Sequence, residues 1–293
     1  MAAALHFQKG AFVMKKKWLK IAAFILALAL IVGIGWFANA LVGNPLSKLL
    51  AKNAAERHLE ENYADTDFYI DSVNFSFKDT RYYAHIKSPS SIDSHFPLYI
   101  DMLGRIEHDF YQNDVLDGWN TAQRIGMDYR ELVDTVLDNP SFPYVCDIGY
   151  GDIEFIPKEY ADNPDVPQYA FYIEDLEVDG IYDLREVGAQ AGKLVLYIAD
   201  DTITVERAAE IMLDIKNIID DAGIAFYAMD FALRHPKTEE GYNWDESIDI
   251  NDFLYADIYE DGFVERVAAA NDATQQYYAE QDAEKAELIA NQE

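Results

Sequence analysis

The chain of 293 residues can hold one or two domains besides any targeting segment, and half of its residues are apolar, so a substantial core can form. Its 23 Lys and Arg against 53 Asp and Glu give a net charge of −30, which argues against nucleic acid as a partner because phosphate-backbone binders must supply cations. Residues 1–44 hold five lysines and no acid. The remainder, with 18 basic and 53 acidic residues, therefore carries a charge of −35.

An uncharged apolar stretch over residues 21–42 follows three lysines at 15–17. About 20 apolar residues cross the hydrocarbon layer, and lysines on one side only place that side in the cytoplasm. We therefore predict a cytoplasmic basic tail at 1–20, a transmembrane signal-anchor helix at 21–42 and a plasma-membrane protein whose bulk lies outside. The small residues at 38–40 also fit a signal peptide cleaved after Ala40, which is the alternative.

The first extracytoplasmic α+β domain is predicted at 44–142. Asn44 followed by Pro45 is typical of a helix start, because Asn caps the helix and Pro suits its first position. The apolar alternation changes phase near 71–72, which predicts a β-bulge there. The predicted elements in chain order are a helix at 45–62, strands at 68–77, 81–87 and 96–100, and helices at 102–112 and 129–137.

A second α+β domain is predicted at 143–283, with a frayed tail at 284–293. Apolar strands at 193–199 and 224–233 flank a helix, which predicts a β-α-β unit in a mixed sheet. Gly223 is expected to end that helix. A strand at 248–258 and a helix at 262–283 follow. The face of the crossover helix toward the sheet is predicted from residues spaced by three and four, namely Val205, Ala208, Met212, Ile215 and Ile219.

The chain has one cysteine, Cys146, so it cannot form an internal disulfide. A period of two places Cys146 on the same strand face as Tyr144, Ile148 and Tyr150. This pattern favours a small buried apolar residue over a reactive thiol.

Several short segments resemble the YfjL-like membrane-anchored proteins of Gram-positive bacteria. They are the apolar segment followed by Asn44-Pro45-Leu46-Ser47-Lys48, the hairpin from Val73-Asn74-Phe75-Ser76-Phe77-Lys78-Asp79 into Arg81-Tyr82-Tyr83, Ser88-Pro89, and Asn251-Asp252-Phe253-Leu254-Tyr255-Ala256-Asp257-Ile258-Tyr259. The resemblance covers most of residues 14–265. It implies an anchor and two consecutive extracytoplasmic domains, and it implies no activity.

An acidic loop over residues 175–186 is the sharpest motif of the chain. On the calcium-loop template of EF-hands it places acids at positions 1, 3, 5, 9 and 12 and glycine at position 6. Glu at position 3 crowds the ion, however, and the preceding segment alternates like a strand instead of a helix. A turn at Asp179-Gly180 is therefore favoured over calcium. The candidate calcium ligands are Asp175, Glu177, Asp179, Asp183 and Glu186.

Other chemistry is weakly indicated. His85, His95, Glu107, His108 and Asp109 are ligand types that zinc uses, but their spacing matches no motif. The turn Ala199-Asp200-Asp201-Thr202 precedes a helix, where two carboxylates would repel a phosphate.

The sequence thus predicts a membrane-anchored extracytoplasmic binding or interaction module that is not an enzyme and needs no cofactor. Its predicted partners are the bilayer, through 21–42, and a membrane or cell-envelope protein. The alternative is an extracytoplasmic hydrolase that uses a metal or a carboxylate pair, centred on His85, His95 and His108.

Overall fold

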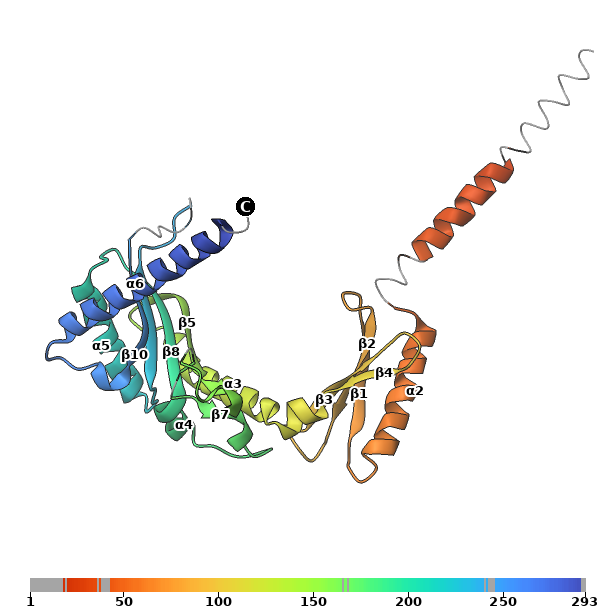
Figure 1. Cartoon of the computed structure of the whole chain (residues 1–293), viewed down its shortest axis with the longest axis horizontal. Coiled ribbons are helices and arrows are strands. Elements are labelled where there is room, and N and C mark those ends of the chain that lie inside the picture. Colours follow the sequence, from red (N-terminus) through yellow and green to blue (C-terminus); the bar gives the residue numbers. More distant parts are fainter. Residues whose placement is uncertain are drawn as a thin grey trace, which may run out of the picture. The chain divides into compact units, whose positions relative to one another are not determined.

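The computed structural model describes residues 18, 20–35, 37, 43–164, 166–167, 169–239, 241 and 246–290. The chain divides into two compact units, Met1–Gln112 and Asn113–Glu293. Each unit contains both helices and a β-sheet (Figure 1). The α+β class and the mixed sheet of the second unit are thereby confirmed.

The first unit is a four-stranded antiparallel sheet packed against one helix. Helix α2 covers Pro45–Asn62, and the strands follow in the order β1-β2-β3-β4. The predicted bulge is present, as a register shift between Ile70 and Ser72. The strand bounds are β1 Tyr69–Ser76, β2 Arg81–Lys87, β3 His95–Ile100 and β4 Ile106–Asp109.

Helix α2 begins where the sequence predicts. The Asn44 side chain accepts a hydrogen bond from the Ser47 backbone N–H at 2.7 Å, which is the N-cap bond. The Tyr82 hydroxyl fixes the chain just before the helix, because it donates to the Asn44 carbonyl at 2.9 Å and accepts from the Asn44 N–H at 3.0 Å. The helix turns its small residues toward the sheet, and Leu46 and Leu49 are exposed.

The predicted helix at 102–112 is wrong. Asp101 accepts hydrogen bonds from the backbone N–H groups of Leu103 and Arg105, each at 2.9 Å, and Gly104 has φ +78°. These features form a tight turn, which sends the chain back as strand β4 beside β3.

The second unit is a four-stranded mixed sheet in the order β10-β9-β8-β5, with helices packed on it. Strands β8 and β9 are parallel, and the other pairs are antiparallel. The short strands β6 Phe155–Ile156 and β7 Phe171–Tyr172 form a separate parallel pair. The other bounds are α3 Trp119–Leu137, β5 Val145–Ile153, α4 Leu184–Ala191, β8 Gly192–Ala199, α5 Val205–Asp221, β9 Ala228–Arg234, β10 Ser247–Leu254 and α6 Phe263–Ala290.

The predicted β-α-β unit is confirmed as β8-α5-β9. Met212 and Ile215 of α5 are fully buried in one cluster with Leu194 and Leu196 of β8. The helix ends at Asp221, and Gly223 two residues later has a φ of +75°, which allows the Ile224 N–H to bond the Ile219 carbonyl.

The predicted domain bounds differ from the structural ones at both ends of the second unit. Helix α3 packs against β5, so residues 113–142 belong to the second unit and the division falls at 112/113 instead of 142/143. The predicted frayed tail is helical up to Ala290, because α6 continues through it, and residues 291–293 lie outside the described residues.

Cys146 lies beside a β-bulge that was not predicted. The register of β5 against β8 shifts between Cys146 and Ile148, so the even-numbered residues do not share one face and Ile148 is exposed. The thiol is half-buried instead of fully buried. Burial, aided by Asp147 and Asp138, raises the pKa of Cys146 to about 11, which keeps the thiol protonated near neutral pH.

Residues 20–35 are helical, and their side chains are exposed. Among the residues that the structure describes, no helix combines the length and apolar character needed to cross a bilayer. Residues 36 and 38–42 of the predicted span lie outside the described residues, as do most of the basic tail and the alternative cleavage position. The transmembrane helix therefore stays a prediction.

Candidate functional site

A lysine surrounded by carboxylates lies at the start of β8. The Lys193 ammonium is 2.8 Å from Asp252 Oδ1, 3.0 Å from Asp230 Oδ2 and 3.5 Å from Glu154 Oε1. Its side chain is only 13% exposed. Side chains alternate along a strand, so Lys193 points to the sheet face opposite Leu194. We call Lys193, Glu154, Asp230 and Asp252 the Lys193 cluster.

A bulge in β10 brings Asp252 to this lysine. The register of β10 against β9 shifts between Ile250 and Phe253, and Asp252 has φ +50°, which is unusual for a residue other than glycine. The conformation is held by the Asp252 N–H, which donates to Asp230 Oδ1 at 2.7 Å. The Tyr169 hydroxyl donates to Asp252 Oδ1 at 2.8 Å, and the Tyr169 ring stacks on Tyr227.

The electrostatics of the cluster keep the lysine charged. Burial disfavours the ammonium, but the hydrogen bond to Asp252 and the charge of Asp230 outweigh it and raise the pKa of Lys193. Burial raises the pKa of Glu154 and Asp230, and Lys193 offsets only part of that rise. A lysine that stays protonated cannot act as a base or nucleophile near neutral pH. The cluster, with three carboxylates to one ammonium, is therefore suited to attract cations and to fix the bulge.

Two hollows share Trp119 in their lining, and the first of them reaches the Lys193 cluster. The first, of about 600 Å³, is lined by one face of α3 and by the end of β5 and β6. Its lining includes Met127, Phe155 and Glu154 of the Lys193 cluster. The second, of about 370 Å³, is lined by three carboxylates, Asp117, Glu159 and Glu174, besides Trp119, Pro157 and Ile173. We call the first the α3 hollow, the second the acidic hollow, and the two together the Trp119 groove.

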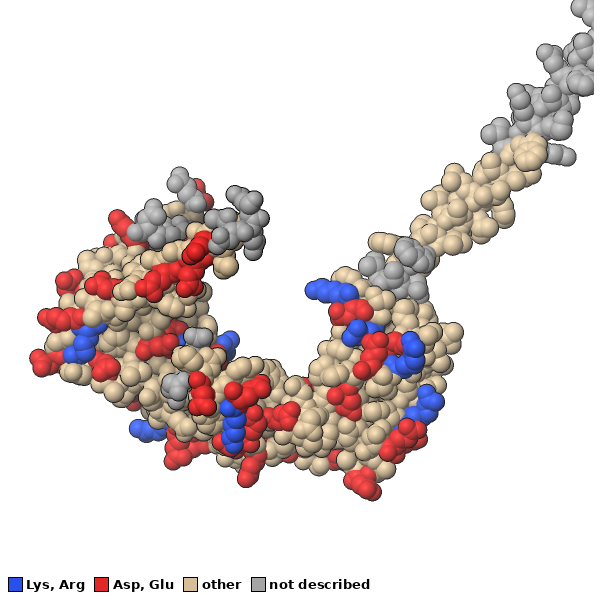
Figure 2. Space-filling view, viewed as in Figure 1, with Lys and Arg blue, Asp and Glu red and all other residues tan. Residues whose placement is uncertain are grey.

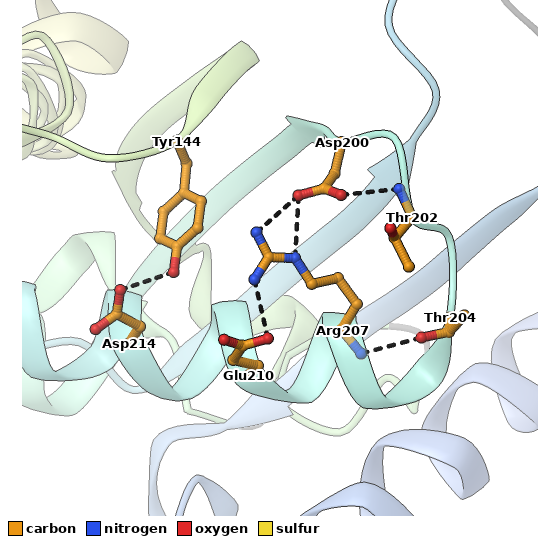
Figure 3. A network of polar contacts seen from close by, with 7 residues as sticks. All are labelled: Tyr144, Asp200, Thr202, Thr204, Arg207, Glu210 and Asp214. Carbon is orange, nitrogen blue, oxygen red and sulfur yellow. Dashed lines mark hydrogen bonds and ion pairs between the residues drawn. The ribbon is translucent and has the colours of Figure 1, made fainter.

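The turn between β8 and α5 carries a second polar network (Figure 3). Asp200 Oδ1 accepts from the Thr202 N–H at 2.8 Å, and Asp200 Oδ2 accepts from Arg207 Nη2 at 2.8 Å and Nε at 3.0 Å. Burial raises the pKa of Asp200, but these donors outweigh it and hold the pKa below its ordinary value. Arg207 also reaches Glu210 at 2.9 Å, and Thr204 caps α5. Asp200 thus ties the turn to the helix.

The structure does not bring the predicted zinc ligands together. Within the described part of the chain, no three His, Cys, Asp or Glu side chains form a group that could hold a metal ion. His85 lies in β2, His95 begins β3, and Glu107, His108 and Asp109 lie in β4. Asp109 instead bonds His58 Nε2 and the Tyr63 hydroxyl, both at 2.7 Å, and these two partners were not predicted.

The predicted calcium ligands occupy a turn followed by a helix start. The Gly180 N–H bonds the Glu177 carbonyl at 2.9 Å, and Asp179 has φ +60°. Asp183 caps α4 through the Arg185 N–H at 2.9 Å, whereas Asp175 pairs with Lys158. The five carboxylates, Asp175, Glu177, Asp179, Asp183 and Glu186, are all on exposed residues.

We expect calcium to raise the melting temperature no more than magnesium does, without saturation, at 0.15 M NaCl. Only an ion that binds the folded state at a defined site stabilises it by the saturable mass-action relation. Differential scanning fluorimetry with millimolar CaCl₂ or MgCl₂ measures this, and a variant with Asp175→Ala and Glu186→Ala should respond like the unaltered chain. If the rise in melting temperature saturates at micromolar calcium, and the double variant shows no such rise, residues 175–186 bind calcium.

The Lys193 cluster was not predicted, although the sequence carries a signal for it. Lys193 begins an otherwise apolar strand, and Asp230 interrupts the nearly continuous apolar run from 224 to 233. A charged residue in a buried strand needs a partner, so the two could have been paired. Asp252 gave no such signal because its position depends on the β10 bulge.

Comparisons with known proteins agree with the two structural units. Residues 15–110 match the model of the YfjL-like N-terminal domain, and residues 128–268 match that of the YfjL-like C-terminal domain. No curated protein and no solved structure matches the chain.

Proposed function

The chain belongs to the YfjL-like family, and from this premise we propose that it is a membrane-anchored binding module whose two α+β units face the outside of the cell. Residues 21–42 serve as the anchor in this proposal, and the second unit provides the binding surface. The Trp119 groove is the observation that supports a binding role most directly, because it exposes large apolar side chains beside carboxylates.

The described part of the apolar segment supports the anchor. Residues 20–35 form a helix whose large apolar side chains, such as Phe24, Leu26 and Ile31, are between 60% and 70% exposed. A soluble domain rarely exposes such a contiguous apolar surface. The exposed Leu46 and Leu49 of α2 follow soon after, and the Tyr82 hydroxyl bonds the Asn44 carbonyl just before that helix.

The charge distribution supports the orientation. The lysines at 15–17 and Lys20 lie before the apolar segment. Residues 113–293, by contrast, hold 11 basic and 42 acidic residues, a net charge of −31. On the visible surface of this second unit, acidic side chains are scattered widely and outnumber the basic ones (Figure 2). By the positive-inside rule the basic end stays in the cytoplasm.

Protease added to intact protoplasts is expected to degrade the chain from about residue 43 onward and to remove a C-terminal tag. Immunoblotting follows the tag, and a cytoplasmic marker protein must stay intact as the control. A variant with glutamate at positions 15, 16, 17 and 20 should lose the fixed orientation and become partly protected. A tag that resists protease in intact protoplasts and is digested after lysis would contradict the proposed location.

A further inference from the structure

We propose that the Trp119 groove binds an extended peptide segment in which an apolar side chain and a Lys or Arg side chain point to the same side. This inference rests on the proposed binding role and names the chemistry of the partner, a basic-apolar segment of another protein. The apolar side chain occupies the α3 hollow, and the basic side chain occupies the acidic hollow.

The α3 hollow has the features of a site for an apolar side chain. Trp119, Gly126 and Met127 lie on one face of α3, because they are spaced by seven and eight residues. Trp119 is 45% exposed and Met127 is 64% exposed, although both are large and apolar. Gly126 leaves the floor open, since a Cβ there would meet only Asp152 Oδ1 at 3.9 Å. An apolar side chain in this hollow would cover surface that is otherwise in water.

The acidic hollow selects a cation. Its lining contains Asp117, Glu159 and Glu174 and no basic residue. The nearest cation along the chain, Lys158, directs its ammonium to Asp175, which is not part of the lining. Glu174 stays anchored because it accepts from the Lys158 N–H at 3.0 Å. Trp119 also lines this hollow, and an aromatic ring can add a cation–π contact to a Lys or Arg side chain.

The arrangement of the two hollows selects an extended peptide. Both hollows have Trp119 in their lining, so one extended ligand that contacts Trp119 can reach both. Side chains on the same side of an extended chain are separated by two residues, or about 6.5 to 7 Å. Asp152 and Glu154 of the α3 hollow, together with the net charge of −31 on this unit, attract a basic segment over a longer distance. Arg130 also lines the α3 hollow, but its guanidinium lies over the Tyr150 ring, 4.3 Å from the ring centre, and so takes part in an internal contact.

The test uses the full chain in nanodiscs and two terminally blocked heptapeptides that are otherwise Gly and Ser. One peptide carries Phe and, two residues later, Lys; the other carries Glu in place of that Lys. Isothermal titration calorimetry should give a dissociation constant at least about tenfold lower for the Lys peptide at 0.05 M NaCl, because opposite charges attract at low salt. The difference should shrink at 1 M NaCl, where the Debye length is about 3 Å.

Three variants locate the binding surface. Trp119→Ala should raise the dissociation constant of the Lys peptide by at least about tenfold, as expected for a central aromatic contact. Glu159→Gln should weaken the binding of the Lys peptide, whereas the binding of the Glu peptide should stay the same or become tighter. Glu206→Gln is the matched control, since it removes the same charge from an exposed position on α5, and it should change neither peptide. Trp119→Phe should recover most of the affinity that Trp119→Ala loses.

The outcomes separate this inference from the proposed function. Equal affinity for the two peptides, no binding of the Lys peptide, or an unchanged affinity in Trp119→Ala with its melting transition intact would overturn the peptide site. Each of these results leaves the protease experiment unaffected. A tag protected in protoplasts, by contrast, would overturn the location while a selective Lys-peptide interaction would still support the groove.

Discussion

Replacing Lys193 by methionine is expected to lower the free energy of unfolding of the second unit by about 3 kcal/mol at pH 7. Methionine is close to lysine in volume, so the packing is retained while the positive charge is lost. Asp230, Glu154 and Asp252 are then left without the ammonium that lies 2.8 to 3.5 Å from them. Removing one partner of a buried ion pair costs about 3 to 5 kcal/mol, and the half-exposed Asp252 argues for the lower end.

The pH dependence of this loss identifies its cause. The pKa values of Glu154 and Asp230 are already raised by burial, and without Lys193 they rise further. A carboxyl whose folded pKa lies above its unfolded value binds protons more tightly when folded, so acid stabilises the folded state relative to neutral pH. The stability gap between Lys193→Met and the unaltered chain should therefore narrow from pH 8 toward pH 5.

Urea unfolding followed by tryptophan fluorescence measures the effect. Trp119 and Trp244 belong to the second unit, and residues 43–112 contain no tryptophan. The other two tryptophans, Trp18 and Trp36, precede residue 43. Lys285→Met makes the same chemical change at an exposed position of α6 and should cost less than about 0.5 kcal/mol. If Lys193→Met lowers the free energy of unfolding only slightly, or by the same amount at pH 5 and pH 8, the lysine does not stabilise the three carboxylates.

The β10 bulge shows where sequence-based reasoning stops. Continuous apolar runs predict β8 and β9, and apolar residues spaced by three and four predict α5, because these patterns report burial directly. The conformation of Asp252, with its φ of +50°, depends instead on a hydrogen bond to Asp230 on the neighbouring strand. No local pattern encodes a partner 22 residues away. The sequence could therefore predict that Lys193 pairs with Asp230, but not that Asp252 joins them.

The missed strand β4 has a different cause. The sequence of residues 102–112 predicts a helix, although Asp101 and Gly104 are residue types that favour a turn. An Asp side chain that bonds the N–H groups two and four residues ahead competes with helix formation at its start. The early part of α3 was also missed. That helix begins at Trp119, after Gly118 with φ +81°, ten residues before the predicted start at 129, so the α3 hollow could not be foreseen.

Ile215→Ala is expected to lower the free energy of unfolding of the second unit by about 2 to 5 kcal/mol, which tests the core behind the site. Ile215 is fully buried in the cluster that joins α5 to Leu194 and Leu196, so the substitution removes apolar contacts and leaves a cavity. Leu194 and Leu196 lie on the face of β8 opposite Lys193, so the substitution removes packing from that face without changing the charges of the Lys193 cluster.

Urea unfolding gives the size of this loss, and Ile181→Ala is the matched control. Ile181 is 98% exposed, so the same truncation there should change the free energy of unfolding by less than about 0.5 kcal/mol. Because Lys193 and Ile215 lie on opposite faces of the sheet, the Ile215→Ala loss should not depend on pH between 5 and 8, unlike that of Lys193→Met. A loss from Ile215→Ala as small as that of Ile181→Ala would mean that α5 does not pack on the sheet through this face.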